Sequence, residues 1–213
     1  MANSSYVNAS EISISDFLKA VASADGPHGA VSAATVAGGI GTAVLLMVAS
    51  APNAASISGS DQAKLVEAAA ALADVQKQMV ETVETETAVR IFTARNMPQA
   101  SETERKKRHA ALQLAIRAAA DVPLEVMRLC RDALRHAATV AKYASRVGSA
   151  DVQFASALLQ AAFNAARANL EVKLSSLTDT QFITSVIDEI ARLSDEAVSS
   201  ARAAESHLYV PPA

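Results

Sequence analysis

The stretch that decides the fold is Asp61–Val80, which reads DQAKLVEAAAALADVQKQMV. Apolar side chains recur in it every three or four positions, at Leu65, Ala68, Leu72, Val75 and Met79. This spacing places them on one face of a helix, which then packs against neighbouring helices. The pattern predicts a helix from Asp61 to about Asn96, where Met97-Pro98 ends it.

The composition extends this prediction to the whole chain of 213 residues. Hydrophobic residues make up 51%, and 48 of them are alanines, the best helix formers. Only 7 Gly, 6 Pro and 4% aromatic residues accompany them. This balance excludes a β-sandwich, a disulfide scaffold, a collagen-like chain and a disordered acidic tail. It predicts an all-α protein.

The charge and cysteine content limit the partners and the compartment. The net charge is −3 and the pI is near 5.8, so we expect no nucleic-acid partner. Cys130 is alone and has no partner for an internal disulfide, which suits a cytoplasmic protein. The first 16 residues lack the basic and apolar regions of a secretory signal.

One segment calls for a membrane test, because 35 residues between Asp25 and Asp61 carry no charge. Its centre, Val31–Ala51, is long enough to span a bilayer. Many of its residues are small, however, and no Lys, Arg, Trp or Tyr anchors flank it. We therefore expect a buried helix of a soluble bundle and no membrane partner.

Turn and cap signals divide the chain into a flexible leader (1–10), one helical domain (11–205) and a flexible tail (206–213). Pro123 marks either a kink or a fresh first turn, and Gly148 a helix end. The result is an up-and-down bundle of about seven helices. Their expected starts are Ser13, Val31, Asp61, Ser101, Pro123, Asp151 and Thr178.

Several landmarks resemble one known family. They are Asp16-Phe-Leu-Lys-Ala20, Ser32-Ala-Ala34, Ala37-Gly-Gly-Ile-Gly41, Met47-Val48, Ala115-Ile-Arg-Ala-Ala-Ala-Asp-Val-Pro-Leu-Glu125, Gly148-Ser-Ala-Asp151 and Ala168-Asn-Leu170. Together they resemble the cyclodeaminase/cyclohydrolase family over roughly residues 14–200. The family includes methenyltetrahydrofolate cyclohydrolases and the cyclodeaminase half of formiminotransferase-cyclodeaminase.

The resemblance implies an all-α homodimer that binds a one-carbon-substituted tetrahydrofolate in a cleft between helices. A cyclohydrolase adds water to the methenyl bridge of this substrate, and a cyclodeaminase closes the bridge with loss of ammonia. Both reactions need a positioned proton donor or acceptor. The folate derivative is then a substrate, and we expect no tightly bound cofactor and no metal.

The chain departs from the family in two turn or loop segments and on the long helix, where Glu84 replaces the family's acidic residue and Ala88 its Phe. A Pro-Thr-Pro-Gly-Gly-Gly-Ser turn corresponds to Gly26-Pro-His-Gly-Ala-Val-Ser32, where Ala30 and Val31 replace two glycines. A Leu-Thr-Ile-Gly-Lys-Lys-Lys-Tyr segment corresponds to Ala51–Ser58, which contains no lysine or tyrosine. Lysines suit the carboxylate tail of a folate, so their loss weakens the folate assignment.

Two residues are the candidates for catalysis. Glu84 aligns with the acidic residue of the family, and Glu81 lies one turn before it, so the pair can raise one carboxyl pKa. The alternative is a solvated acidic face formed with Glu86. His28 has a ring suited to proton transfer, although a histidine in a turn is more often an ordinary surface residue.

The candidate substrate-binding residues are Gly29, Ser32, Glu81, Asp151, Asn169 and Lys173. Asp151 is explained equally well as a helix N-cap. Asn169 and Lys173 share a helix face, and the family typically has a second Asn where Lys173 stands.

Three hypotheses remain open. The first is an enzyme acting on a one-carbon folate. The second is a family member recruited to a different lyase- or cyclase-type reaction in a more apolar pocket. The third is a non-catalytic helical dimer, in which His28, Glu84 and Asp151 do not converge.

Overall fold

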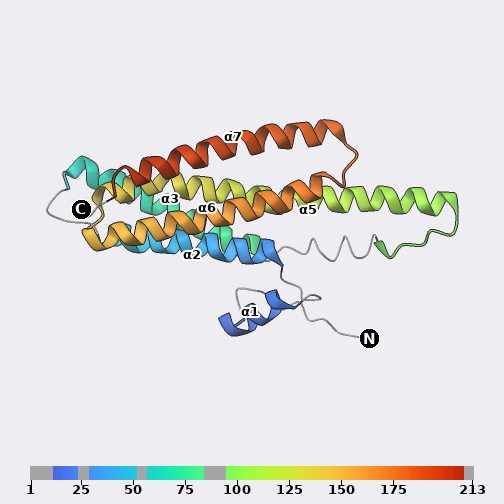
Figure 1. The fold of residues 1–213 in the computed structure, drawn as a ribbon, viewed down its shortest axis with the longest axis horizontal. Helices are drawn as coiled ribbons and strands as arrows, with labels where there is room; N and C mark the ends of the chain where they lie inside the picture. The colour runs from blue at the N-terminus through green and yellow to red at the C-terminus, as the bar shows by residue number, and fades with distance from the viewer. Residues whose placement is uncertain (1–11, 24–28, 52–56, 84–94, 209–213) are drawn as a thin grey trace, which may run out of the picture.

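The computed structural model describes residues 12–23, 29–51, 57–83 and 95–208, and in these ranges it is all-helical, with no strand (Figure 1). The all-α prediction is therefore confirmed, and six described helices come close to the expected seven. Their bounds are α1 (Ile14–Ala22), α2 (Ala30–Ser50), α3 (Gly59–Val83), α5 (Glu102–Tyr143), α6 (Arg146–Leu174) and α7 (Thr180–Glu205).

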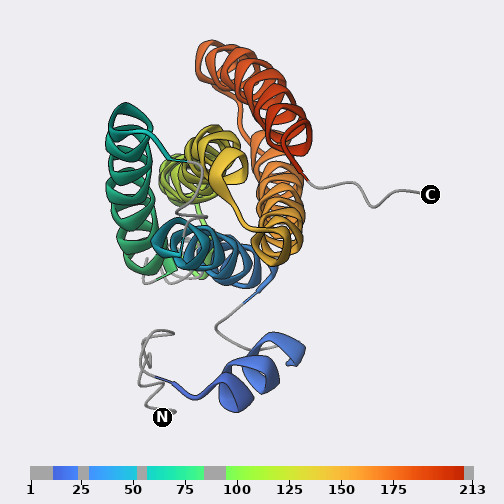
Figure 2. The same cartoon turned by 90° about the vertical axis from the view of Figure 1, so that its left-hand side faces the viewer.

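The long helices lie side by side around α5, with α2, α3, α6 and α7 packed against it (Figure 2). The core consists of aliphatic residues and alanines between these helices. All five residues of the predicted α3 seam are buried, from Leu65, which is 4% exposed, to Met79, which is 1% exposed. The periodicity of Asp61–Val80 thus predicted the buried face of α3 correctly.

Helix α2 packs against α3, α5 and α6 through small residues. A Cβ atom on Gly41 would lie 2.9 Å from the backbone oxygen of Ala155 in α6 and 3.0 Å from Leu159 Cγ. Only a glycine therefore allows the two backbones to approach this closely. Among the described helices, α2 is also the one that is long and apolar enough to cross a membrane by length and composition.

Of the two alternatives at Pro123, the fresh helix start is wrong, because α5 runs without interruption through this residue. Proline removes one backbone hydrogen bond and strains the preceding turn. Here Pro123 is buried together with Leu124, at the point where α5 packs into the bundle. The tertiary packing on both sides of Pro123 compensates for the lost hydrogen bond and the strain in the preceding turn.

The expected boundary at Gly148 and Asp151 is also displaced. Helix α5 ends at Tyr143, and Ser145 caps α6 by accepting a hydrogen bond from the Gly148 amide at 3.1 Å. Asp151 lies inside α6 and is not its N-cap. Serine is as good a cap as aspartate, so sequence alone did not distinguish the two starts.

The caps expected at Ser13 and Ser101 agree with the structure, whereas the last helix is capped one residue later than expected. Ser13 caps α1, and Asp179, not Thr178, caps α7 by accepting a hydrogen bond from the Phe182 amide at 3.0 Å. Ser101 and Glu104 form a reciprocal capping box at the start of α5. These contacts join residues three apart, which is why a local pattern predicts them.

Gly41→Ala should lower the free energy of unfolding by about 2 kcal/mol, because the new methyl group meets backbone that has no room to move. Gly39→Ala is the matched control two residues away. Its Cβ would be 3.9 Å from Met79 Cβ, an ordinary contact, so better helix propensity should stabilise the bundle by up to ~1 kcal/mol. Chemical denaturation measures both, and equal effects would contradict the close approach of α2 and α6.

Candidate functional site

The first turn of α2 contains two of the predicted site residues. Gly29 is the exposed N-cap, with φ −119° and ψ −163°, and Ser32 is half-buried. The Gly29 backbone is one that any residue adopts, and a Cβ there would meet nothing within 4 Å. In the described chain, then, neither backbone conformation nor space requires a glycine at this position.

The contacts between α2 and α6 fix which residues share an end of the bundle. Val48 contacts the position of Gly148, whereas Gly41 contacts Leu158 and Leu159, so the two helices run antiparallel. The first turn of α2 therefore lies at the same end as the last turns of α6 (Figure 1). Asn169 and Lys173 occupy those last turns.

Helix α5 brings the family-like proline segment to this end as well. Gly38 of α2 lies against Cys130, and a Cβ there would be 3.4 Å from its sulfur. Both α2 and α5 run antiparallel to α3, so they are parallel to each other. Val31 lies seven residues before Gly38 on α2, and Pro123 lies seven residues before Cys130 on α5. Both steps correspond to about 10 Å along the helix axis.

Lys173 has an unusual environment for a lysine. It is half-buried, its ammonium donates a hydrogen bond to Asn169 Oδ1, and no carboxylate pairs with it among the described residues. Burial disfavours the charged form and lowers the pKa of Lys173 below its usual value. A lysine in this state can exchange a proton more readily than a solvated one.

Asp151 does not join this group. It lies on the same continuous helix as Asn169, eighteen residues earlier, which is about 27 Å along the axis. Both residues are half-buried, but within one chain they cannot touch the same reacting carbon. The expectation that Asp151 and Asn169 lie in one cradle is not met within a single subunit.

The predicted acidic pair is only partly described. Glu81 is exposed on α3, where its carboxylate lies 3.9 Å from Lys77 Nζ. Glu84 and His28, the two proposed catalytic residues, lie outside the described residues, as does Glu86. Their roles therefore stay predictions.

Comparisons with known proteins bear directly on this end of the bundle. The family model for formiminotransferase-cyclodeaminase matches residues 13–192. This chain belongs to that family. The match includes the first turn of α2, Pro123, Asn169 and Lys173.

A solved structure supports the same fold. The formiminotetrahydrofolate cyclodeaminase of Thermotoga maritima superimposes with a TM-score of 0.82 over 93% of this chain and 96% of the other. The two sequences are 19% identical, so this likeness shows the shared architecture. The comparison with curated proteins gives no match.

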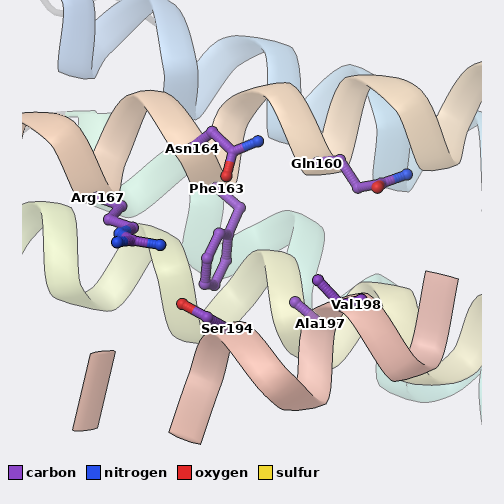
Figure 3. Close-up of a pocket in the computed structure, with 7 residues that line it drawn as sticks. All are labelled: Gln160, Phe163, Asn164, Arg167, Ser194, Ala197 and Val198. Atoms are coloured by element: carbon purple, nitrogen blue, oxygen red, sulfur yellow. The ribbon is translucent and has the colours of Figure 1, made fainter. Parts of the chain in front are cut away.

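Two hollows are lined in part by residues of α7, and neither contains one of the predicted site residues. The first, about 100 Å³, lies between α6 and α7 and has Phe163 as its apolar wall (Figure 3). Its other lining residues are Gln160, Asn164, Arg167, Ser194, Ala197 and Val198. Arg167 is paired with Glu171 at 2.8 Å, so this hollow offers neutral polar groups and no unpaired charge.

The second hollow is more open, about 380 Å³, and lies where α5 meets the start of α7. Arg117 stacks over the Phe182 ring at 4.5 Å and pairs with Asp179 at 3.0 Å. The capping pattern of the sequence favoured the neighbouring Thr178, so no role was predicted for Asp179. Its contact with Arg117 could not be predicted from a local pattern, because the two residues are 62 positions apart.

Two further observations concern Cys130 and metal binding in the described chain. Cys130 is buried, which raises its pKa to about 12 and leaves the thiol unreactive. Within the described ranges, no three His, Cys, Asp or Glu side chains group as they would around a metal ion.

Lys173→Met should stabilise the bundle at pH 7 by about 1 kcal/mol, because the wild-type protein keeps a half-buried ammonium without a counter-charge. For this size of domain the melting temperature should rise by about 2–4 °C. The folded pKa is the lower one, so the unfolded chain binds more protons between the two pKa values. The difference between variant and wild type should therefore shrink as the pH rises towards 10.

Lys77→Met is the control, since Lys77 is exposed and its contact with Glu81 contributes little. Thermal denaturation from pH 7 to pH 10 measures both variants. A melting temperature that falls for Lys173→Met would show that the ammonium is structural.

Proposed function

We propose that this protein is an enzyme of the cyclodeaminase/cyclohydrolase type that acts on a one-carbon-substituted tetrahydrofolate. The observation that carries the proposal is the convergence of separate family-like segments at one end of the bundle. The first turn of α2, Pro123 of α5, and Asn169 of α6 come from positions up to 140 residues apart. Membership of the family over residues 13–192 supports the same assignment.

Lys173 and Asn169 are the described residues with suitable chemistry. In the neutral state, the Lys173 amine accepts a proton from the attacking water or folate nitrogen. In the protonated state, it donates one to the nitrogen that leaves. Asn169 holds the amine through its Oδ1 atom and keeps its own amide N–H groups for the substrate. Ser32 contributes a hydroxyl from the first turn of α2.

Glu84 is the second proposed acid or base, on its family position alone. It follows Val83, the last described residue of α3, and α3 runs antiparallel to α2 with Met79 beside Gly38 and Gly39. The last described turn of α3 therefore lies at the same end of the bundle as the first turn of α2. His28 stays a proposal of the same kind, since Gly29 immediately follows it.

A different substrate is the alternative, and Val31 favours it. This residue is half-buried in the first turn of α2, where the family has a glycine in its turn, so it makes the surface more apolar and bulkier. The loss of the lysine segment is a weaker argument. Ala51, at its start, is twenty residues and about 30 Å from Val31 along α2, at the opposite end of this helix.

The purified protein should accelerate the loss of the 5,10-methenyltetrahydrofolate chromophore over buffer, or release ammonia from 5-formiminotetrahydrofolate. Lys173→Met should lower kcat by about 100-fold if the amine transfers the proton. Asn169→Ala should lower it by about 10-fold through loss of positioning. Asn164→Ala, on the α7 side of the same helix, should leave the rate unchanged.

A folate substrate would be rejected if the protein accelerated neither reaction and if its melting temperature did not change on adding folate. Activity that survives Lys173→Met and Asn169→Ala would reject these roles and leave the family assignment intact. Glu84→Gln then separates an enzyme from a non-catalytic scaffold. The substitution should abolish turnover by an enzyme, whereas a scaffold should show no functional change.

A further inference from the structure

The connection between α6 and α7 is held against α5 by the side chain of Gln113 (Figure 1). This residue is half-buried and lies two positions before Ala115, the first buried residue of α5. Its Nε2 atom donates a hydrogen bond to the Ser176 carbonyl at 2.9 Å. Its Oε1 atom accepts from the Thr178 amide at 2.9 Å and from the Thr178 hydroxyl at 3.1 Å. One side chain therefore makes three hydrogen bonds to residues 63 and 65 positions away.

The partners of Gln113 leave its amide a single orientation. A carbonyl oxygen only accepts a hydrogen bond and a backbone amide only donates one, so Nε2 must face Ser176 and Oε1 must face Thr178. Hydrogen bonds weaken steeply when they are misaligned. The three bonds together therefore hold the connection at one position relative to α5.

The hydrogen bond to Ser176 continues into the last turn of α6. The Ser176 amide donates to the carbonyl of Lys173 at 3.1 Å, and the Leu177 amide donates to that of Leu174 at 3.1 Å. Leu174 and Leu177 are both buried, which anchors the apolar side of this turn. Gln113 fixes its polar side, and a single residue, Ser176, links the glutamine to the backbone of Lys173.

We propose that Gln113 is a positioning residue of the candidate site, which holds the end of α6 so that Lys173 and Asn169 keep their places. In its catalytic part this inference rests on the proposed function, in which Lys173 transfers the proton. Helix ends fray readily, because their last carbonyls have no partner within the helix. A displacement of about 1 Å of a proton-transfer group can lower the rate about 100-fold.

The environment of Lys173 depends on the position of this turn. The ammonium is half-buried and donates a hydrogen bond to Asn169 Oδ1, one turn earlier in α6. Burial is the cause of its lowered pKa. If the last turn loosens, water reaches the ammonium and the pKa of Lys173 rises towards the ordinary value of a lysine. The pKa of Lys173 therefore reports on the position of the turn without any substrate.

Arg117, one turn after Gln113 on α5, holds the other side of the same connection. It pairs with Asp179 at 3.0 Å and stacks over the Phe182 ring at 4.5 Å. Asp179 is the N-cap of α7 and Phe182 lies in its first turn, so these contacts act on α7 and not on the end of α6. Arg117 is therefore a matched control for Gln113.

Gln113→Met removes all three hydrogen bonds and keeps a side chain of similar length and helix propensity. Arg117→Met removes the ion pair to α7 by the same replacement. We expect the pKa of Lys173, followed by NMR of ¹³C-labelled lysine, to rise in Gln113→Met and to stay unchanged in Arg117→Met. The Lys173 signal is assigned by its loss in Lys173→Met. Circular dichroism should show unchanged helix content for both variants.

Amide hydrogen exchange locates the effect along the chain. Gln113→Met should speed the exchange of the Ser176 and Leu177 amides by about fivefold, because the turn opens more often without its hydrogen bonds. Arg117→Met should act instead on the Phe182 amide at the start of α7. Equally fast exchange of Ser176 and Leu177 in both variants, or an unchanged pKa of Lys173 in Gln113→Met, would overturn the positioning role.

Turnover separates this inference from the proposed function. On the folate substrate, Gln113→Met should lower kcat about 10-fold and change KM by less than about twofold, because the turn positions the group that transfers the proton. Equal losses of kcat in Gln113→Met and Arg117→Met would reject the role of Gln113 in the reaction. A wild-type protein without folate turnover would reject the proposed function, and the pKa and exchange measurements would still decide whether Gln113 positions Lys173.

Discussion

The close contact between the backbones of α2 and α6 determines which of the described candidate groups on these two helices share an end of the bundle. Gly41 leaves no room for a side chain against the Ala155 carbonyl, so this contact fixes both the distance and the register of the two helices. Because they run antiparallel, the start of α2 meets the end of α6. The grouping of Ser32 with Asn169 and Lys173, and the exclusion of Asp151, both follow from this single constraint.

The sequence predicted the features that depend on nearby residues. The capping box at Ser101 and the cap at Ser13 join atoms three positions apart, and the buried face of α3 follows from helical periodicity. The uninterrupted course of α5 through Pro123 could not be predicted in this way. Whether a helix tolerates a proline depends on the packing of distant segments around it, and a local pattern carries no such information.

The candidate site shows the same division. Helical spacing correctly placed Asn169 and Lys173 on one face, where they form a hydrogen bond. The family resemblance also made Asp151 a candidate substrate-binding residue. A resemblance shows which residues occur in a sequence, but it gives no distance between them. The stacking of Arg117 on Phe182 could not be predicted from the sequence, because the two residues are 65 positions apart and neither indicates the other.

The neutral character of α2 has two structural consequences that strengthen each other. Small uncharged residues on its inner side allow the close contact with α6, and uncharged residues on its outer side leave a surface without electrostatic preference for solvent. Charges on the outer side would solvate a monomer at no cost to the inner packing. The packing of the single bundle therefore does not require the absence of charge over these 35 residues.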